Sequence, residues 1–371
     1  MWSSTAFRRT CLGFSAKGLN LVPATSTSLR HQIQARFLRT GQPLFRFGKS
    51  SSSPSETLGS RARKIKAKIE ESSPVKLQKK ESEGWSSNHG GGEQERMTGL
   101  LKPTLFAASF VGLAFTGSAI WQYENIRSIA VERWKRTHKK AVQKYGEFRR
   151  DMNHIWSHLD DASKLFVPIL AANGAVFLMW KIPRLAPFMM KHFVSDPAAK
   201  NVCLPMINSV FSHVNWWHFF VNMYCLHSFL GPCVETLGKE QFLAVYLSGG
   251  IVASLGSIVH KVLTQRPGAS LGASGAIMTV LGMCCTIYPD KQLQIIFLPW
   301  YPFSADSGMK GIMAIDALGI LLGWRFFDHA AHLAGILFGI LYVKYGQELL
   351  WSNRGTVMRA WDSIRGGMND E

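Results

Sequence analysis

The sequence predicts an all-α polytopic membrane protein, in which one extra transmembrane helix precedes a core of six. Apolar stretches of about 20 residues, the length that crosses a bilayer, recur from residue 98 onward. Basic residues gather before and between these stretches, as they do around membrane spans. The net charge of +18, from 42 Lys and Arg against 24 Asp and Glu, is therefore assigned to membrane flanks. A nucleic-acid partner is not expected, since the basic residues do not cluster within a folded domain.

The apolar stretches define the order of the membrane part. The extra transmembrane helix is expected over 98–122, and a charged connector follows over 123–162. The six-helix core covers 163–346, and residues 347–371 form a C-terminal tail. No internal repeat is visible, so an inverted-repeat transporter has no support from the pattern. The core spans are expected at about 163–180, 216–233, 241–262, 271–288, 308–324 and 329–346.

The N-terminal region has a different composition. Residues 1–52 are rich in Arg and Ser and contain no Asp or Glu, which is typical of a mitochondrial transit peptide. A cationic segment of this kind is drawn toward the negative side of a membrane potential. Residues 53–97 are rich in Ser, Lys, Glu and Gly, and are expected to form a disordered polar tether. The 6 cysteines form no CxxC pair, so we expect buried thiols and no disulfide framework or zinc site.

Polar side chains interrupt three of the predicted core spans. Ser274 lies between glycines in a GASG sequence, His218 precedes Asn222 by four residues, and His332 lies in an AHLAGILFG sequence. Polar groups inside a membrane are costly and are candidates for function. Small residues allow close approach of helices in lipid. The supporting glycines beside these polar groups are Gly272, Gly275, Gly335 and Gly339.

The three features share one position within their spans. His218, Ser274 and His332 lie near the starts of the second, fourth and sixth core spans, which run in the same direction across the bilayer. Their side chains are therefore expected at similar depth below one surface, in a chamber that water can reach. A channel or transporter would instead distribute polar residues along a path across the membrane.

These residue types favour acyl transfer to a serine. Ser274 is the expected nucleophile, and His332 is the expected general base, because a serine hydroxyl needs an adjacent base. Three donors could form an oxyanion hole: the Asn222 amide, the His218 ring N–H and the backbone N–H of Ser274. A dyad is chemically sufficient if packing holds the imidazole.

Two acidic residues lie in or beside the last two predicted core spans. Asp328 lies four residues before His332 and could orient it, but its position in a short loop favours a solvated charge, so no third acid is expected. Asp316 lies within the fifth core span without a second intramembrane carboxylate, which an aspartyl protease would need. We therefore expect Asp316 to pair with a polar neighbour.

The combined motifs resemble the signature of the rhomboid intramembrane serine proteases. The resemblance rests on GASG, on His332 with its following glycines, and on His218-xxx-Asn222, and it covers 163–346. The extra span and the leader resemble the mitochondrial branch of that family. The resemblance implies cleavage of single-span membrane proteins within the lipid bilayer, with no cofactor or metal, and roles in mitophagy signalling and apoptosis. The Trp-Arg pair of many rhomboids is not found in the loop 181–215.

The expected location is the mitochondrial inner membrane, with the N-terminus in the matrix and the C-terminus in the intermembrane space. The basic residues of the connector favour the opposite orientation, but the leader favours this one, and acidic residues accompany the basic ones in the connector. The strongest alternative function is a non-catalytic rhomboid-like scaffold that binds transmembrane segments. The reactivity of Ser274 distinguishes the two functions.

Overall fold

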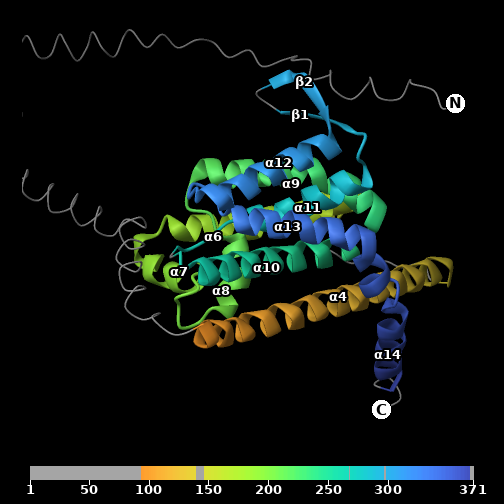
Figure 1. Ribbon diagram of the computed structural model, residues 1–371. Helices are drawn as coiled ribbons and strands as arrows, with labels where there is room; N and C mark the ends of the chain where they lie inside the picture. The colour runs from red at the N-terminus through yellow and green to blue at the C-terminus, as the bar shows by residue number, and fades with distance from the viewer. Residues whose placement is uncertain (1–92, 139–145, 267, 296–297, 368–371) are drawn as a thin grey trace, which may run out of the picture. The chain divides into compact units, whose positions relative to one another are not determined.

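The computed structural model describes residues 93–138, 146–266, 268–295 and 298–367. These residues belong to one compact unit. The expected transit peptide at 1–52 and nearly all of the expected tether at 53–97 lie outside them. The described part of the chain is helical, as the sequence predicted, apart from one small two-stranded sheet (Figure 1).

The long helices follow the predicted spans to within a few residues at most ends. They are α4 (Glu93–His138), α6 (Asp161–Trp180), α9 (Trp216–Leu237), α10 (Lys239–Thr264), α11 (Ser274–Ile287), α12 (Ala305–Leu322) and α13 (His329–Leu341). Shorter elements connect them: α5 (Glu147–His158), η1 (Pro183–Leu185), α7 (Ala186–His192), α8 (Cys203–Asn208), η2 (Ser209–Phe211), β1 (Gln292–Ile295) and β2 (Leu298–Ser304). After α13 come η3 (Tyr342–Trp351) and α14 (Arg354–Gly367). Strands β1 and β2 pair in antiparallel fashion between α11 and α12.

The helices differ in whether they are long and apolar enough to cross a bilayer. Among the described residues, four segments are long and apolar enough to cross a bilayer, namely Gly99–Trp134, Asp161–Trp180, Lys239–Thr264 and His329–Gly366. Helix α11 is apolar but shorter. The polytopic membrane fold is therefore confirmed, whereas the count of one plus six stays a prediction.

Helix α4 continues to His138, through the first part of the segment expected as a connector. Its C-terminal part contains several Glu, Arg and Lys residues, which favour helix even without an apolar face. Helix α14 packs against α4, where Trp361 and Arg365 both donate to Glu124. The C-terminal helix is thereby fixed to the extra N-terminal helix.

The interior is built around α10, α11 and α13. In Figure 1, α13 lies alongside α10 and α11, and α4 lies along α10. Small residues permit these close contacts: Gly256 of α10 meets Ala334 of α13, and Gly275 of α11 meets Ala253 of α10.

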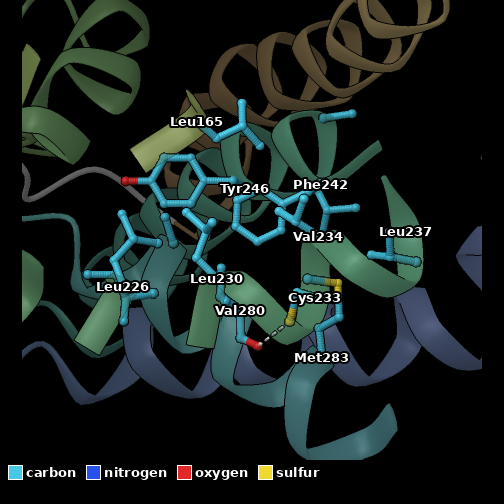
Figure 2. Close-up of a cluster of buried hydrophobic side chains, with 14 of the residues drawn as sticks. Leu165, Leu226, Leu230, Cys233, Val234, Leu237, Phe242, Tyr246, Val280 and Met283 are labelled. Carbon is cyan, nitrogen blue, oxygen red and sulfur yellow. Dashed lines mark hydrogen bonds between the residues drawn. The ribbon is translucent and has the colours of Figure 1, made fainter. Parts of the chain in front are cut away.

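An apolar cluster beside these helices joins α9 to α10 and α11 (Figure 2). Phe242 and Tyr246 of α10 are completely buried in it. Cys233 of α9 is also buried and free, and its Sγ lies 3.9 Å from the carbonyl oxygen of Val280. This thiol therefore acts as a small apolar side chain, as the sequence predicted. Together the packed helices give a rigid frame for the residues at their ends.

Candidate active site

Ser274 is the first residue of α11, and the loop before it is held by hydrogen bonds. Gly272 has φ +125°, a conformation that glycine adopts without steric cost. The N–H of Gly272 donates to the carbonyl oxygen of Ser209 at 2.9 Å, and Ser270 pairs with Ser195 as an isolated β-bridge. The first N–H groups of a helix lack partners within it, so the backbone N–H of Ser274 suits an oxyanion.

His332 lies one turn into α13 and meets Ser274 directly. The distance from His332 Nε2 to Ser274 Oγ is 2.9 Å, and the histidine is 8% exposed. This is hydrogen-bond distance between an imidazole nitrogen and a hydroxyl. The two residues are 58 positions apart in the sequence, so only the pairing of α11 with α13 brings them together.

Glycines bring α11 and α13 into backbone contact beside this pair. A Cβ on Gly335 would collide with the carbonyl oxygen of Gly275, and a Cβ on Gly339 with that of Thr279. The Thr279 hydroxyl donates to the carbonyl oxygen of Gly335 at 3.0 Å. The predicted supporting role of Gly275, Gly335 and Gly339 is consistent with this close packing.

Asp316 is a member of the site that the sequence interpretation left out. It is 3% exposed on α12, and its Oδ1 lies 3.5 Å from His332 Nδ1 and 2.7 Å from His329 Nδ1. The expectation of a polar partner holds, but the expectation that no third acid approaches His332 is wrong. The missing information was the packing of α12 against α13, which no sequence spacing reveals.

Asp328 differs from the solvated charge that the sequence favoured. It is the N-cap of α13, where Oδ1 accepts from the N–H of Ala331 at 3.1 Å. Its Oδ2 pairs with Lys261 at 3.1 Å and accepts from Ser257 at 2.5 Å. Burial acts to raise the pKa of Asp328, but Lys261 and the hydroxyl donors outweigh it and hold this pKa well below its usual range. Asp328 therefore anchors the start of the helix that carries His332.

His218 and Asn222 lie on one face of α9, one turn apart. The His218 ring packs on Gly272, where a Cβ would lie 2.5 Å from His218 Cε1. The Asn222 amide donates to the carbonyl oxygen of His218 at 2.7 Å, which leaves its second N–H for another acceptor. Both residues line the cavity that Ser274 lines.

His213 is a second residue that the sequence interpretation missed. Its Nε2 accepts from the backbone N–H of Ala273, at 3.3 Å, and its ring lies edge-on to His218 with centroids 4.9 Å apart. Burial, together with the neighbouring His218, lowers the pKa of His213 to about 3. The neutral ring can therefore accept a hydrogen bond from the loop before Ser274. The only sequence signal was a second histidine five residues before His218.

A cavity of about 1100 Å³ joins these groups. All four predicted polar residues line it, and so does Asp316; these residues are Ser274, His332, His218, Asn222 and Asp316. Apolar side chains of α9 and α12 complete much of the wall, for example Trp217, Val221, Ile312 and Ile315. Within the described parts of the chain, no group of three His, Cys, Asp or Glu residues is placed to hold a metal ion.

Comparison with known proteins places the site inside a family domain. The family model "Rhomboid domain" matches residues 201–347, which include all four predicted polar residues. The chain is 48% identical over 271 residues to the human "Presenilin-associated rhomboid-like protein, mitochondrial", covering 72% of each chain. It is 34% identical over 198 residues to "Rhomboid protein 1, mitochondrial" of Saccharomyces cerevisiae, covering 53% of this chain and 57% of that protein.

Proposed function

The chain belongs to the rhomboid family, and from this premise we propose that it is an intramembrane serine endopeptidase acting through Ser274 and His332. Its mitochondrial relatives support a protease-type role in mitochondria and a multi-pass membrane location there. The observation that carries the proposal is the 2.9 Å contact between His332 Nε2 and Ser274 Oγ, in a cavity among apolar helices.

The reaction follows from the positions of the polar groups. Ser274 Oγ attacks the peptide carbonyl carbon, while its proton passes to His332 Nε2. The carbonyl oxygen becomes an oxyanion, for which the Asn222 amide, the His218 ring and the backbone N–H of Ser274 are the proposed donors. His332 then gives the proton to the leaving amine, and the C–N bond breaks to leave an acyl-enzyme. A water molecule, deprotonated by His332, hydrolyses the ester and restores Ser274.

The substrate class is inferred from the setting of the cavity. Apolar side chains of α9 and α12 that line the cavity are exposed, including Val221 at 49% and Ile315 at 55%, and a lipid-embedded segment would suit them. A peptide bond inside a helix is inaccessible to a nucleophile, so the substrate must unwind at the cleavage point. We infer single-span membrane proteins of mitochondria as substrates, with cleavage in or near their membrane segment.

The finer location and biological role belong to the same proposal. Inner-membrane residence, with the N-terminus in the matrix and the C-terminus in the intermembrane space, is supported by the acid-free composition of residues 1–52. Roles in mitophagy signalling and apoptosis rest on the family resemblance and would follow from the choice of substrate.

Cleavage of a reporter with a single membrane span tests the proposal. The full chain is reconstituted in liposomes as wild type, Ser274→Ala, His332→Ala and the control Ser228→Ala. The Ser228 hydroxyl donates to the carbonyl oxygen of Tyr224 in its own helix at 2.9 Å. Wild type and Ser228→Ala should cleave at equal rates, and the other two should not cleave. Equal cleavage by Ser274→Ala would refute the nucleophile. A folded wild type that binds the reporter without cleaving it would support the scaffold function instead.

A further inference from the structure

Asp316 has an environment that ordinary structural pairing does not explain. Its carboxylate is buried among helices, and no Lys or Arg within the described ranges forms an ion pair with it. Two imidazoles face it instead, and Nδ1 of both His329 and His332 points toward the same oxygen, Oδ1. A buried carboxylate without a cation is costly, so a structural role alone would favour an amide or an apolar residue at this position.

The surroundings of His329 fix this arrangement. Gly319, one turn after Asp316 on α12, leaves room for the His329 ring, because a Cβ there would lie 2.5 Å from His329 Cδ2. The rings of Phe326 and Phe327 lie around it, with centroid distances of 5.4 and 6.1 Å. Packing therefore holds His329 with its Nδ1 on Asp316, and His329 Nε2 has no hydrogen-bond partner among the described residues.

On the basis of the proposed protease function, we propose that Asp316 is a positioning residue for His332, and that His329 holds Asp316 in place. A carboxylate on the Nδ1 side of His332 favours the tautomer in which Nδ1 carries the proton. Nε2 is then a bare acceptor that faces Ser274 Oγ at 2.9 Å. Ser274, His332 and Asp316 thus have the order of a serine–histidine–carboxylate triad.

The distance of 3.5 Å between His332 Nδ1 and Asp316 Oδ1 is long for a hydrogen bond, and we attribute this length to the resting state of the site. In the neutral resting state His329 is the nearer donor, at 2.7 Å. When His332 takes the serine proton it becomes an imidazolium, whose attraction to the carboxylate is much stronger in a buried site. Catalytic hydrogen bonds that are long at rest tighten during reaction. Asp316 would therefore stabilise the charged state of His332 more than its neutral state.

Other titratable groups near His332 would not reproduce this effect. His218 of α9 lines the same cavity but offers an imidazole, not a carboxylate. His260 lines the same cavity from α10. Asp328 is already engaged by Lys261. Only Asp316 places a negative charge directly beside Nδ1 of His332 within the described structure.

Charge removal at Asp316 separates a positioning role from a structural one. Asp316→Asn keeps the size and removes the charge, and Asp316→Glu keeps the charge. Glu240→Gln is the matched control, because Glu240 of α10 is also a buried carboxylate. It accepts a hydrogen bond from Asn125 of α4 at 2.6 Å. Reporter cleavage is measured in liposomes from pH 5 to pH 9, together with thermal unfolding. The rate of Ser274 labelling by a fluorophosphonate is followed in parallel.

Asp316→Asn should lower kcat about 10²- to 10⁴-fold with KM nearly unchanged. The acid limb of its activity–pH curve should move to lower pH, because the imidazolium of His332 loses its stabilising charge. Asp316→Glu should keep the acid limb of the wild type, and Glu240→Gln should keep both kcat and the curve. The inference is wrong if Asp316→Asn has the kcat of the wild type and loses activity at the same acidic pH. It is also wrong if Asp316→Glu and Asp316→Asn lose activity at the same acidic pH as each other.

His329 supplies an independent test if Asp316→Asn does not fold. His329→Asn retains an N–H donor near the position of Nδ1, whereas His329→Ala has none. The alanine variant should lose at least tenfold more kcat than the asparagine variant, an energy of about 1.4 kcal/mol. Equal kcat values would overturn the role of His329. A wild type that neither labels nor cleaves would refute the proposed function itself, which is a different outcome from failure of the Asp316 variants alone.

Discussion

The backbone contact between α11 and α13 predicts a strong effect of one added methyl group. In Gly335→Ala the new Cβ would collide with the carbonyl oxygen of Gly275 and lie 3.3 Å from Met278 Cβ. The clash is with a backbone atom, which cannot rotate away as a flexible side chain could. We therefore expect α13 to shift away from α11 by on the order of 1 Å. Overpacking of this kind costs about 1–3 kcal/mol of stability. The same shift would lengthen the 2.9 Å contact of His332 with Ser274. A misplacement of about 1 Å lowers kcat about 10²-fold.

Reporter cleavage and thermal unfolding in one detergent measure both effects of Gly335→Ala. Gly174→Ala in α6 is the control, because a Cβ there has nothing within 4 Å. It should retain wild-type kcat and gain up to about 1 kcal/mol, since alanine favours helix over glycine. Wild-type kcat in Gly335→Ala would show that close helix packing does not set the dyad geometry.

Three further substitutions probe the surrounding groups. Asn222→Ala should lower kcat about 10²- to 10³-fold with KM unchanged, and a rise in KM alone would assign Asn222 to substrate binding. His213→Ala should lower kcat about tenfold by leaving the Ala273 N–H without its acceptor. Because the pKa of His213 is about 3, that loss should be the same at every pH from about 5 to 9, and a pH-dependent loss would contradict it. Asp328→Asn should lower the free energy of unfolding by about 3 kcal/mol by leaving Lys261 unpaired. Since the folded-state pKa of Asp328 is depressed, this difference should be constant from about pH 5 to 8 and shrink below about pH 4; a constant difference at low pH would refute it.

The helices were predictable because the bilayer imposes a strong sequence requirement. Apolar runs bounded by polar residues located α6 and α10 closely. The continuation of α4 to His138 left no such signal, because a charged helix outside the hydrocarbon has no apolar run. The packing of α14 on α4 was also invisible, since it depends on pairs such as Arg365 with Glu124 across 241 positions.

The candidate site was predictable where one residue carried its own signal. Ser274 and His332 stood out because polar groups near glycines are costly inside apolar spans. Asp316 stood out for the same reason, but its partners belong to another helix, and only packing shows that His332 and His329 share it. His213 gave little signal because it lies in a loop, where a histidine is unremarkable until its contact with Ala273 is known.

The central claim is that His332 activates Ser274 as a nucleophile, and covalent labelling tests it most directly. The full chain in liposomes is treated with a fluorophosphonate, digested, and analysed by mass spectrometry for the modified residue, with His332→Ala and Ser228→Ala in parallel. We predict one phosphonylated serine, Ser274, in wild type and Ser228→Ala, and none in His332→Ala. Modification of another serine, or equal labelling of Ser274 without His332, would contradict the account.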